Sequence, residues 1–212
     1  MTEKKGLSAL DVLKSGPVIP VIVISNPDHA VPLAEALLAG GIKVLEITLR
    51  SDAALESIRR IRLEVPDVLV GAGTVLSERD LQAVAEAGGR FAISPGLTPN
   101  LLAAARQASI PLIPGVASAS ELMLALEAGL TELKFFPAQA AGGVQMLQSF
   151  NGPFPQVTFC PTGGITLQNY KEYLALKNVA CVGGSWLVPS EKIEQGAWAA
   201  ITQLSQEAVA GL

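Results

Sequence analysis

The sequence has few charged or aromatic residues and almost no cysteine or histidine. Of its 212 residues, 16% are charged and 5% are aromatic, and there are two cysteines and one histidine. Cys160 and Cys181 match no zinc or redox spacing, and no group of Asp, Glu and His has the spacing of metal ligands. We therefore expect no metal ion, no cofactor and two reduced, buried thiols, with a disulfide between them as the alternative.

Two kinds of partner find no support in the composition. The net charge is −4, and no basic cluster interrupts it, which argues against a nucleic-acid surface. No apolar run approaches the roughly 18 residues of a membrane span. The start, MTEKKGLSALDVLKSG, lacks the apolar core of a signal peptide and carries acids that a transit peptide avoids. These features predict a cytoplasmic protein that acts on small molecules, small anions included.

Apolar, β-rich runs recur along the chain and alternate with helical patterns. The runs start at residues 18, 44, 68, 91, 111, 132, 158 and 180. Strands that alternate with helices form right-handed βαβ units and a parallel sheet. Eight such units predict one (β/α)8 TIM barrel over residues 1–212. An open doubly wound sheet is the alternative, but the first run ends in ISNPDHA, which is no dinucleotide fingerprint.

Several of the helical stretches carry signals for their own ends. Ser77 and Ser118 stand at helix starts, and Gly88 and Gly129 follow the corresponding helix ends. The stretch 7–16 predicts an extra N-terminal helix that closes the barrel floor, and 191–211 predicts the last helix. Half of the residues are hydrophobic, which is enough for a large single core.

The second strand carries polar side chains on one face. In VLEITLR, Leu45, Ile47 and Leu49 alternate with Glu46, Thr48 and Arg50. Because the apolar face must meet the helices, the acid, the hydroxyl and the guanidinium point into the barrel and rise toward its catalytic end. A structural Glu46–Arg50 ion pair is the alternative.

The sixth strand, ELKFFP, places a lysine where a buried strand is expected. Lys134 and Phe136 share one face, and Leu133 and Phe135 share the other. If the latter pair faces the helices, Lys134 lies inside the barrel. Desolvation favours the neutral amine, which attacks carbonyl carbons, and an interior Glu46 can carry protons. Together with Arg50 as a carboxylate ligand, this predicts Schiff-base chemistry on a keto acid. A lysine whose head reaches water is the alternative.

Three further strand ends offer groups that could bind a substrate. Thr74 ends the third strand and either shares the substrate carboxylate or caps the next helix. The last two strands end in PTGGI and VGGSW, which lie where this fold binds phosphate. The expected phosphate donors there are Gly163, Gly164, Gly183, Gly184 and Ser185, although a GG pair is often only a turn.

Seven segments together resemble a known family. These are VLEITLR, VGAGTV, FAISPGL, PLIPGV, KFFPA, CPTGGI and GGSWLVP. They closely resemble the 2-keto-3-deoxy-6-phosphogluconate (KDPG) and 4-hydroxy-2-oxoglutarate aldolase family, from about residue 16 to about residue 189. The resemblance implies a (β/α)8 homotrimer that cleaves KDPG to pyruvate and glyceraldehyde 3-phosphate, and often 4-hydroxy-2-oxoglutarate to pyruvate and glyoxylate.

The resemblance also implies a role for each matching residue. Lys134 would form the Schiff base, and Glu46 would be the general acid and base. Arg50 and Thr74 would hold the pyruvate carboxylate, and Phe136 would line the pyruvate pocket. Thr162 would contact the sugar chain, and the phosphate would lie on Gly163, Gly164, Gly184 and Ser185.

Three other activities stay open at this point. An aldolase for the galactonate epimer has a similar lysine and glutamate, although Thr162 favours the gluconate compound. A non-catalytic sugar-phosphate-binding barrel would use the glycine loops but not a buried lysine. A phosphate-binding isomerase or synthase would work without an imine.

Overall fold

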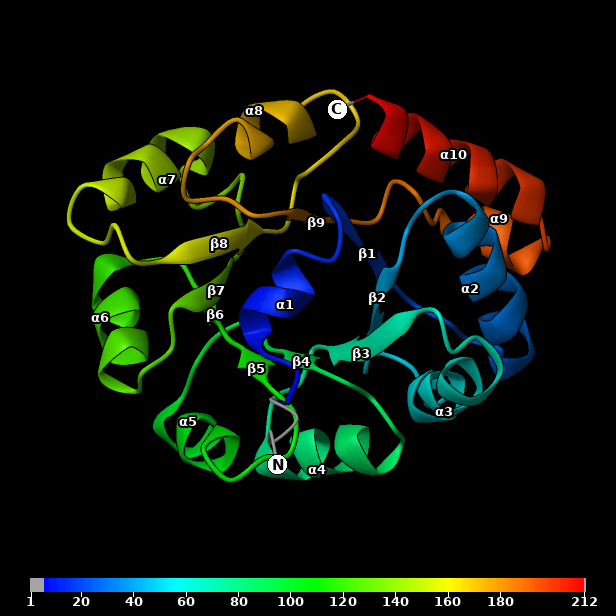
Figure 1. The fold of residues 1–212 in the computed structure, drawn as a ribbon, viewed down its shortest axis with the longest axis horizontal. Coiled ribbons are helices and arrows are strands. Elements are labelled where there is room, and N and C mark those ends of the chain that lie inside the picture. The colour runs from blue at the N-terminus through cyan, green and yellow to red at the C-terminus, as the bar shows by residue number, and fades with distance from the viewer. Residues whose placement is uncertain (1–5, 212) are drawn as a thin grey trace, which may run out of the picture.

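The computed structural model describes residues 6–211, and its strands lie inside a ring of helices (Figure 1). The strands are β1 (Val18–Ile22), β2 (Val44–Thr48), β3 (Leu69–Gly73), β4 (Ala92–Ile93), β5 (Leu112–Ile113), β6 (Gly115–Val116), β7 (Glu132–Phe135), β8 (Thr158–Pro161) and β9 (Val182–Gly184).

All strand pairs are parallel, and together they form a curled sheet. One part has the order β5-β4-β3-β2-β1-β9, and the other has the order β6-β7-β8. Isolated bridges between Phe159 and Val179 and between Thr162 and Gly183 link β8 to the β9 segment. The first and last strands are neighbours as well, with Val18 opposite Val182. Because parallel strands all end at one edge, the predicted site residues gather there.

The helices cover the outside of this sheet, except for α1, which lies over its middle in Figure 1. They are α1 (Ala9–Leu13), η1 (Pro27–His29), α2 (Ala30–Ala39), α3 (Ala54–Glu64), α4 (Glu78–Glu86), α5 (Pro99–Ala105), α6 (Ala119–Glu127), α7 (Gly143–Asn151), α8 (Tyr170–Leu174), α9 (Ser190–Glu194) and α10 (Trp198–Ala210). None of the helices in residues 6–211 has the length and apolarity that a bilayer crossing requires.

The predicted helix signals are confirmed. The Ser77 side chain accepts from the backbone of Asp80, and Ser118 forms a capping box with Glu121. Gly88 and Gly129 have φ values of +86° and +81° just beyond the same two helices. Glycine reaches this left-handed region without a Cβ penalty, which ends the helix.

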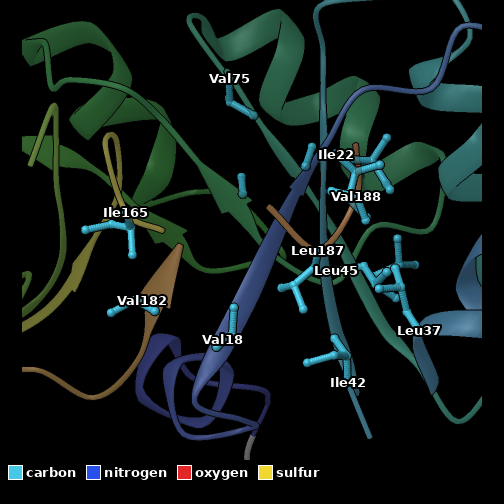
Figure 2. Packing of buried hydrophobic residues seen from close by; sticks show 14 of the residues in the cluster. Val18, Ile22, Leu37, Ile42, Leu45, Val75, Ile165, Val182, Leu187 and Val188 are labelled. Atoms are coloured by element: carbon cyan, nitrogen blue, oxygen red, sulfur yellow. The ribbon is translucent and has the colours of Figure 1, made fainter. Parts of the chain in front are cut away.

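The strands bury apolar side chains on both faces. Toward the helices, a large cluster includes Leu45, Ile47, Leu133 and Phe135, and Figure 2 shows other members such as Val18 and Leu187. On the opposite face lies a smaller cluster, here called the interior cluster, made of Val12, Leu13, Ile19, Val44, Phe91, Ile93, Ile113, Cys160 and Cys181. The alternation predicted for VLEITLR and ELKFFP, which are β2 and β7 in the structure, is therefore confirmed.

Two predicted elements are each divided in two. The run 111–116 is two short strands, because Pro114 between them has no N–H to donate to a ladder. The predicted helix 191–211 is α9 and α10, which are separated at Gly196, where φ is +63°. In both places a single residue interrupts an otherwise regular pattern.

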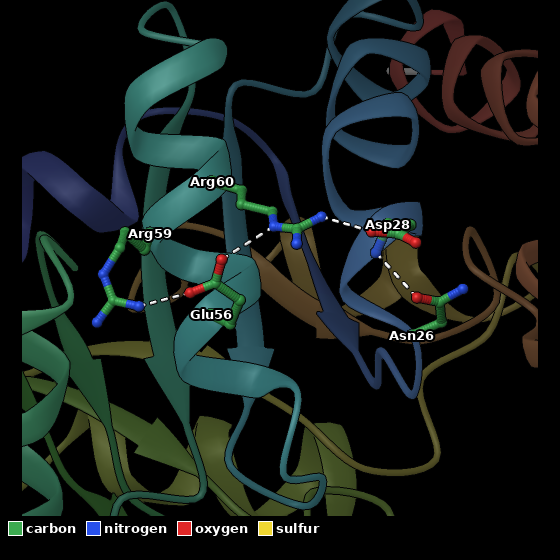
Figure 3. A network of polar contacts seen from close by, with 5 residues as sticks. All are labelled: Asn26, Asp28, Glu56, Arg59 and Arg60. Carbon is green, nitrogen blue, oxygen red and sulfur yellow. Dashed lines mark hydrogen bonds and ion pairs between the residues drawn. The ribbon is translucent and has the colours of Figure 1, made fainter.

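A polar network on the surface ties the segment after β1 to α3 (Figure 3). Arg60 bridges Asp28 at 2.6 Å and Glu56 at 3.0 Å, and Arg59 also pairs with Glu56. Hydrogen bonds from Arg60 and then Arg59 lower the pKa of Glu56. The Asn26 side chain accepts from the Asp28 backbone at 3.0 Å. These contacts hold η1 in place, but exposed pairs of this kind stabilise a fold only weakly.

Candidate active site

The ammonium of Lys134 and the carboxylate of Glu46 form a buried pair between β7 and β2. Lys134 Nζ donates to Glu46 Oε1 at 3.2 Å. The side chains are 7% and 2% exposed, respectively. Burial of two charges is costly, and a pair of opposite charge offsets that cost only while both partners are present. Each residue therefore holds the other in a position that neither would occupy alone.

This pair decides between the readings of the two strands. Lys134 does not extend its head to water, so the surface-lysine alternative is wrong. Among the ion pairs of residues 6–211, Glu46 is bound to Lys134 and not to Arg50, so the Glu46–Arg50 alternative is wrong too. The Lys134 Nζ also lies 5.2 Å from the centre of the half-buried Phe136 ring. The predicted shared face of Lys134 and Phe136 is confirmed.

Gly73 leaves the space that the Glu46 carboxylate occupies. A Cβ at Gly73 would lie 2.1 Å from Glu46 Oε1. Gly73 stands on β3 beside Thr48 of β2, two residues beyond Glu46. No local signal in the sequence predicts this role, because Glu46, the residue whose side chain requires a glycine here, is distant from Gly73 in the sequence.

Arg50 follows β2 and is exposed at the strand end. Its Nε donates to the hydroxyl of Thr48 at 3.1 Å, and that hydroxyl donates to the carbonyl of Ile22 at 2.8 Å. The guanidinium thus stands at the same edge as the pair, with its Nη groups free of ion pairs to any described residue.

Thr74 follows β3 directly and has a φ of +58°. A β-branched residue rarely adopts this left-handed conformation, which costs on the order of 1–3 kcal/mol. Such strain clusters at functional sites. The helix-capping alternative is wrong, because Ser77 is the N-cap of α4.

Thr162 and Gly183 form a second close contact across strand ends. Thr162 is 6% exposed, and a Cβ at Gly183 would lie 2.2 Å from its Oγ1. Gly183 was expected to donate to a phosphate through its backbone. In the structure, the absence of a side chain at Gly183 also leaves space for the Thr162 hydroxyl.

Gly163 and Gly164 turn the chain after β8. Their φ values are +99° and +77°. The Gly163 carbonyl accepts from the Gln139 backbone, and the Gly164 carbonyl accepts from the Asn169 side chain, both at 3.0 Å. The hydrogen bonds among the described residues use both glycine carbonyls as acceptors and neither glycine N–H as a donor, and successive N–H groups of this kind can bind an anion.

Gly184 and the exposed Ser185 end β9 at the same edge. A Cβ at Gly184 would lie 1.7 Å from Cζ3 of Trp186, so the indole ring occupies the place of a side chain. The strand ends of β8 and β9 therefore present glycine backbone and the hydroxyls of Thr162 and Ser185, with no lysine or arginine among them.

The two cysteines are free thiols in the interior cluster. A hydrogen bond with Cys160 and then burial raise the pKa of the Cys181 thiol well above its ordinary value, and charges on Cys160 and Glu46 add to this. Among residues 6–211, no three His, Cys, Asp or Glu side chains are grouped so as to hold a metal ion.

The chain matches a family model over residues 10–204, and the family is described as KDPG and KHG aldolase. The chain belongs to this family. KHG is 2-keto-4-hydroxyglutarate, the compound also called 4-hydroxy-2-oxoglutarate. Aldolases are lyases that break a carbon–carbon bond. The match to the family model confirms the resemblance drawn from the seven segments.

Curated relatives in the KDPG and KHG aldolase family cover nearly the whole chain. The 2-dehydro-3-deoxy-phosphogluconate aldolase of Dickeya dadantii is 59% identical over 204 residues, which are 96% of each protein. The KHG/KDPG aldolase of Escherichia coli strain K12 is 58% identical over the same share of both.

A solved structure of the family has the same fold. The KDPG aldolase of Legionella pneumophila is 55% identical, with a TM-score of 0.93 over 95% of this chain and 98% of that one. That crystal structure holds pyruvate captured at low pH as a covalent carbinolamine intermediate.

Proposed function

We propose that this chain is a Schiff-base aldolase that reversibly cleaves KDPG to pyruvate and glyceraldehyde 3-phosphate. The observation that carries the proposal is the buried contact of 3.2 Å between Lys134 Nζ and Glu46 Oε1. An amine beside a carboxylate is what imine formation needs, because the imine requires a nucleophile and a proton carrier. The Escherichia coli and Dickeya relatives, named for this activity, and the trapped carbinolamine of the Legionella enzyme support the proposal.

The first step joins Lys134 to the substrate. Lys134 first gives a proton to Glu46, and the neutral amine that results attacks the C2 carbonyl. Glu46 then returns that proton to the leaving hydroxyl, so the carbinolamine becomes a protonated imine and water. The half-buried ring of Phe136 lines this pocket and keeps bulk water from the imine.

The second step breaks the C3–C4 bond. Glu46 takes the proton of the C4 hydroxyl through a water, the C4 oxygen becomes the aldehyde, and the bond electrons move to the imine nitrogen. The resulting enamine takes a proton at C3 from Glu46. Water then hydrolyses the pyruvate imine and returns the free amine of Lys134, so protons and electrons balance.

The carboxylate end of the substrate binds to Arg50 and Thr74. A guanidinium donates two parallel N–H groups to a carboxylate, and the Nη groups of Arg50 form no ion pair with any described residue. The hydroxyl of Thr74 forms no hydrogen bond to another described residue, and it stands at the same edge.

The other end of the substrate extends toward β8 and β9. Thr162 contacts the sugar chain near the aldehyde carbon. The phosphate lies on the backbone of Gly163, Gly164 and Gly184 and on the Ser185 hydroxyl, which supply donors without a cationic side chain. The same site also splits 4-hydroxy-2-oxoglutarate to pyruvate and glyoxylate, and because that substrate has no phosphate, these donors matter little for it.

The proposal extends to the architecture and the assembly. We infer that residues 1–212 form a single (β/α)8 barrel closed by the bridges between β8 and β9, with α1 as the extra N-terminal helix over its floor. The homotrimer rests on the family resemblance, and the cytoplasmic location stays a prediction from the sequence.

The test is intact mass after incubation with pyruvate and sodium borohydride, followed by peptide mapping. One reduced adduct on Lys134 is expected. No adduct, or labels scattered over surface lysines, would mean that the chain binds sugar phosphates without cleaving them. The ratio of kcat/KM for KDPG and its C4 epimer then separates the gluconate activity from the galactonate activity.

A further inference from the structure

The Thr48 hydroxyl is the middle of a two-step hydrogen-bond chain that ends on Arg50. Thr48 is 1% exposed. Its Oγ1 lies 2.8 Å from the carbonyl oxygen of Ile22, which can only accept, and 3.1 Å from Nε of Arg50, which can only donate. A hydroxyl has one hydrogen, so that hydrogen points at Ile22 and a lone pair points at Arg50. The polarity of the chain is therefore set by the main chain of β1.

The backbone on either side of Arg50 is anchored separately. Leu49 N donates to the carbonyl of Gly73 at 2.9 Å, and the Ser51 hydroxyl donates to the carbonyl of Ile24 at 2.5 Å. These contacts hold the main chain, but they leave the long side chain of Arg50 free to rotate. Among the described residues, the side chain is anchored by Thr48 and has no ion pair.

A contact through Nε has a particular consequence for a guanidinium. The group is planar, so one hydrogen bond at Nε fixes the orientation of the plane and points the two Nη groups away from Thr48. Those Nη groups form the fork that binds a carboxylate in two parallel bonds. Without that contact, an exposed arginine samples many rotamers and presents the fork only part of the time.

We propose that Thr48 is a positioning residue that holds the Arg50 guanidinium ready for the substrate carboxylate. This inference rests on the proposed function, in which Arg50 binds that carboxylate. Thr48 itself does not touch the substrate; it acts through Nε of Arg50, and its effect is confined to substrates that carry a carboxylate beside the carbonyl.

The test compares two carbonyl compounds in the borohydride-trapping reaction at Lys134. Pyruvate has the carboxylate, and hydroxyacetone lacks it. In Thr48→Val, which removes the hydroxyl at nearly the same volume, half-maximal trapping should need about tenfold more pyruvate, which corresponds to one lost hydrogen bond. The hydroxyacetone requirement should stay within about twofold of wild type. Thr48→Ala is made in parallel, so that a poorly folding valine variant does not leave the question open.

Two matched variants separate positioning from simple loss of structure. Thr48→Ser keeps the hydroxyl and should restore the wild-type pyruvate requirement. Ser51→Ala removes a neighbouring hydroxyl bond to Ile24, just beyond the end of β1, but leaves the guanidinium contact, and it should also match wild type. If Ser51→Ala weakens pyruvate trapping as much as Thr48→Val does, the effect comes from a general loosening of the backbone after β2 and not from the orientation of Arg50. The inference is then wrong.

A double-mutant cycle completes the test. If Thr48 acts through Arg50, Thr48→Val adds nothing to the pyruvate requirement of Arg50→Gln. Additive losses, equal losses for pyruvate and hydroxyacetone, or no loss in either Thr48 variant would each overturn the inference. These results differ from a failure of the proposed function, in which wild-type Lys134 would not be trapped at all.

Discussion

Glu46 and Lys134 are 88 residues apart in the chain, yet the carboxylate of one accepts a hydrogen bond of 3.2 Å from the other. Their strands, β2 and β7, are not neighbours in the sheet. The two side chains meet because the parallel strands curl, so that alternate residues of distant strands point at one another. The proposed imine chemistry depends on this curvature, because it brings the amine and the carboxylate together.

Lys134→Ala should abolish cleavage and the borohydride adduct, because the variant has no amine at the interior position. It also leaves Glu46 without its counter-charge, so the free energy of unfolding should fall by about 3–5 kcal/mol. Lys134→Arg is the control, since it keeps a positive charge but has no nucleophilic amine. Near-native turnover in either variant, measured as pyruvate release, would remove Lys134 from the mechanism.

Glu46→Gln should slow cleavage by about 10²–10⁴-fold, because the amide cannot exchange the protons that the carboxylate carries. The amide oxygen can still accept from Lys134, but the buried ammonium loses its counter-charge, so the free energy of unfolding should fall by about 3–5 kcal/mol, as in Lys134→Ala. The pyruvate adduct should still form with borohydride, more slowly, as mass spectrometry would report. An unchanged cleavage rate would assign the proton transfers to another group.

Gly73→Ala should lower kcat by about 10²-fold, because its Cβ would lie 2.1 Å from Glu46 Oε1 and displace the carboxylate. Overpacking should also cost about 1–3 kcal/mol of stability in urea unfolding. Gly16→Ala is the matched control, as its Cβ would meet nothing within 4 Å. Wild-type kcat in Gly73→Ala would show that the position of Glu46 is not critical.

Ser185→Ala should raise KM for KDPG about tenfold, the effect of one hydrogen bond to a charged group. KM for 4-hydroxy-2-oxoglutarate should change little, because that substrate has no phosphate. Steady-state kinetics on both substrates decide the matter. Equal changes would place the phosphate away from the ends of β8 and β9.

Cys181 should make the protein less stable at alkaline pH. Its thiol has a raised pKa in the folded chain, first through the hydrogen bond with Cys160 and then through burial. The unfolded thiol loses its proton near pH 8.5 while the folded one keeps it. Above that pH the unfolded state binds fewer protons, so stability falls as pH rises, and below it the effect vanishes.

The measurement for Cys181 is the slope of Tm between about pH 8 and pH 9.5, in wild type and in Cys181→Ser, whose hydroxyl does not titrate. The slope should be smaller in the variant. The window ends below about pH 10, where tyrosines of the unfolded chain begin to titrate. Above that pH Tyr173 would add a pH dependence of its own, because burial and then Glu172 raise its pKa in the folded chain. Identical slopes would contradict the assignment.

Much of the fold follows from local patterns in the sequence. The alternation in VLEITLR identified the inward face of β2, and the serines and glycines at helix ends identified α4 and α6, because these signals act over a few residues. The breaks at Pro114 and Gly196 were missed, since a regular apolar pattern continues through both positions. There, one residue's backbone chemistry outweighs the period.

The residues of the candidate site could be proposed from the sequence, but the neighbouring contacts that position them could not. Lys134 and Glu46 could be paired from strand faces alone. The left-handed backbone of Thr74, the space at Gly73 and the Thr48 contact to Arg50 depend on register between strands. Register is a tertiary property, so no short motif carries it.

The interior cluster has a consequence for the order of events in the proposed aldolase. Val44 precedes Glu46 by two residues on the same strand face, and α1 adds Val12 and Leu13 to the same packing. The side of the Lys134–Glu46 pair toward α1 is therefore packed with hydrocarbon and sulfur, so in the proposed reaction we expect substrate, products and water to enter and leave at the strand-end edge. In the proposed reaction pyruvate is bonded to Lys134 above this packing, and the aldehyde lies nearer the strand ends. The aldehyde therefore leaves first, because pyruvate stays bonded to Lys134 until water hydrolyses the imine.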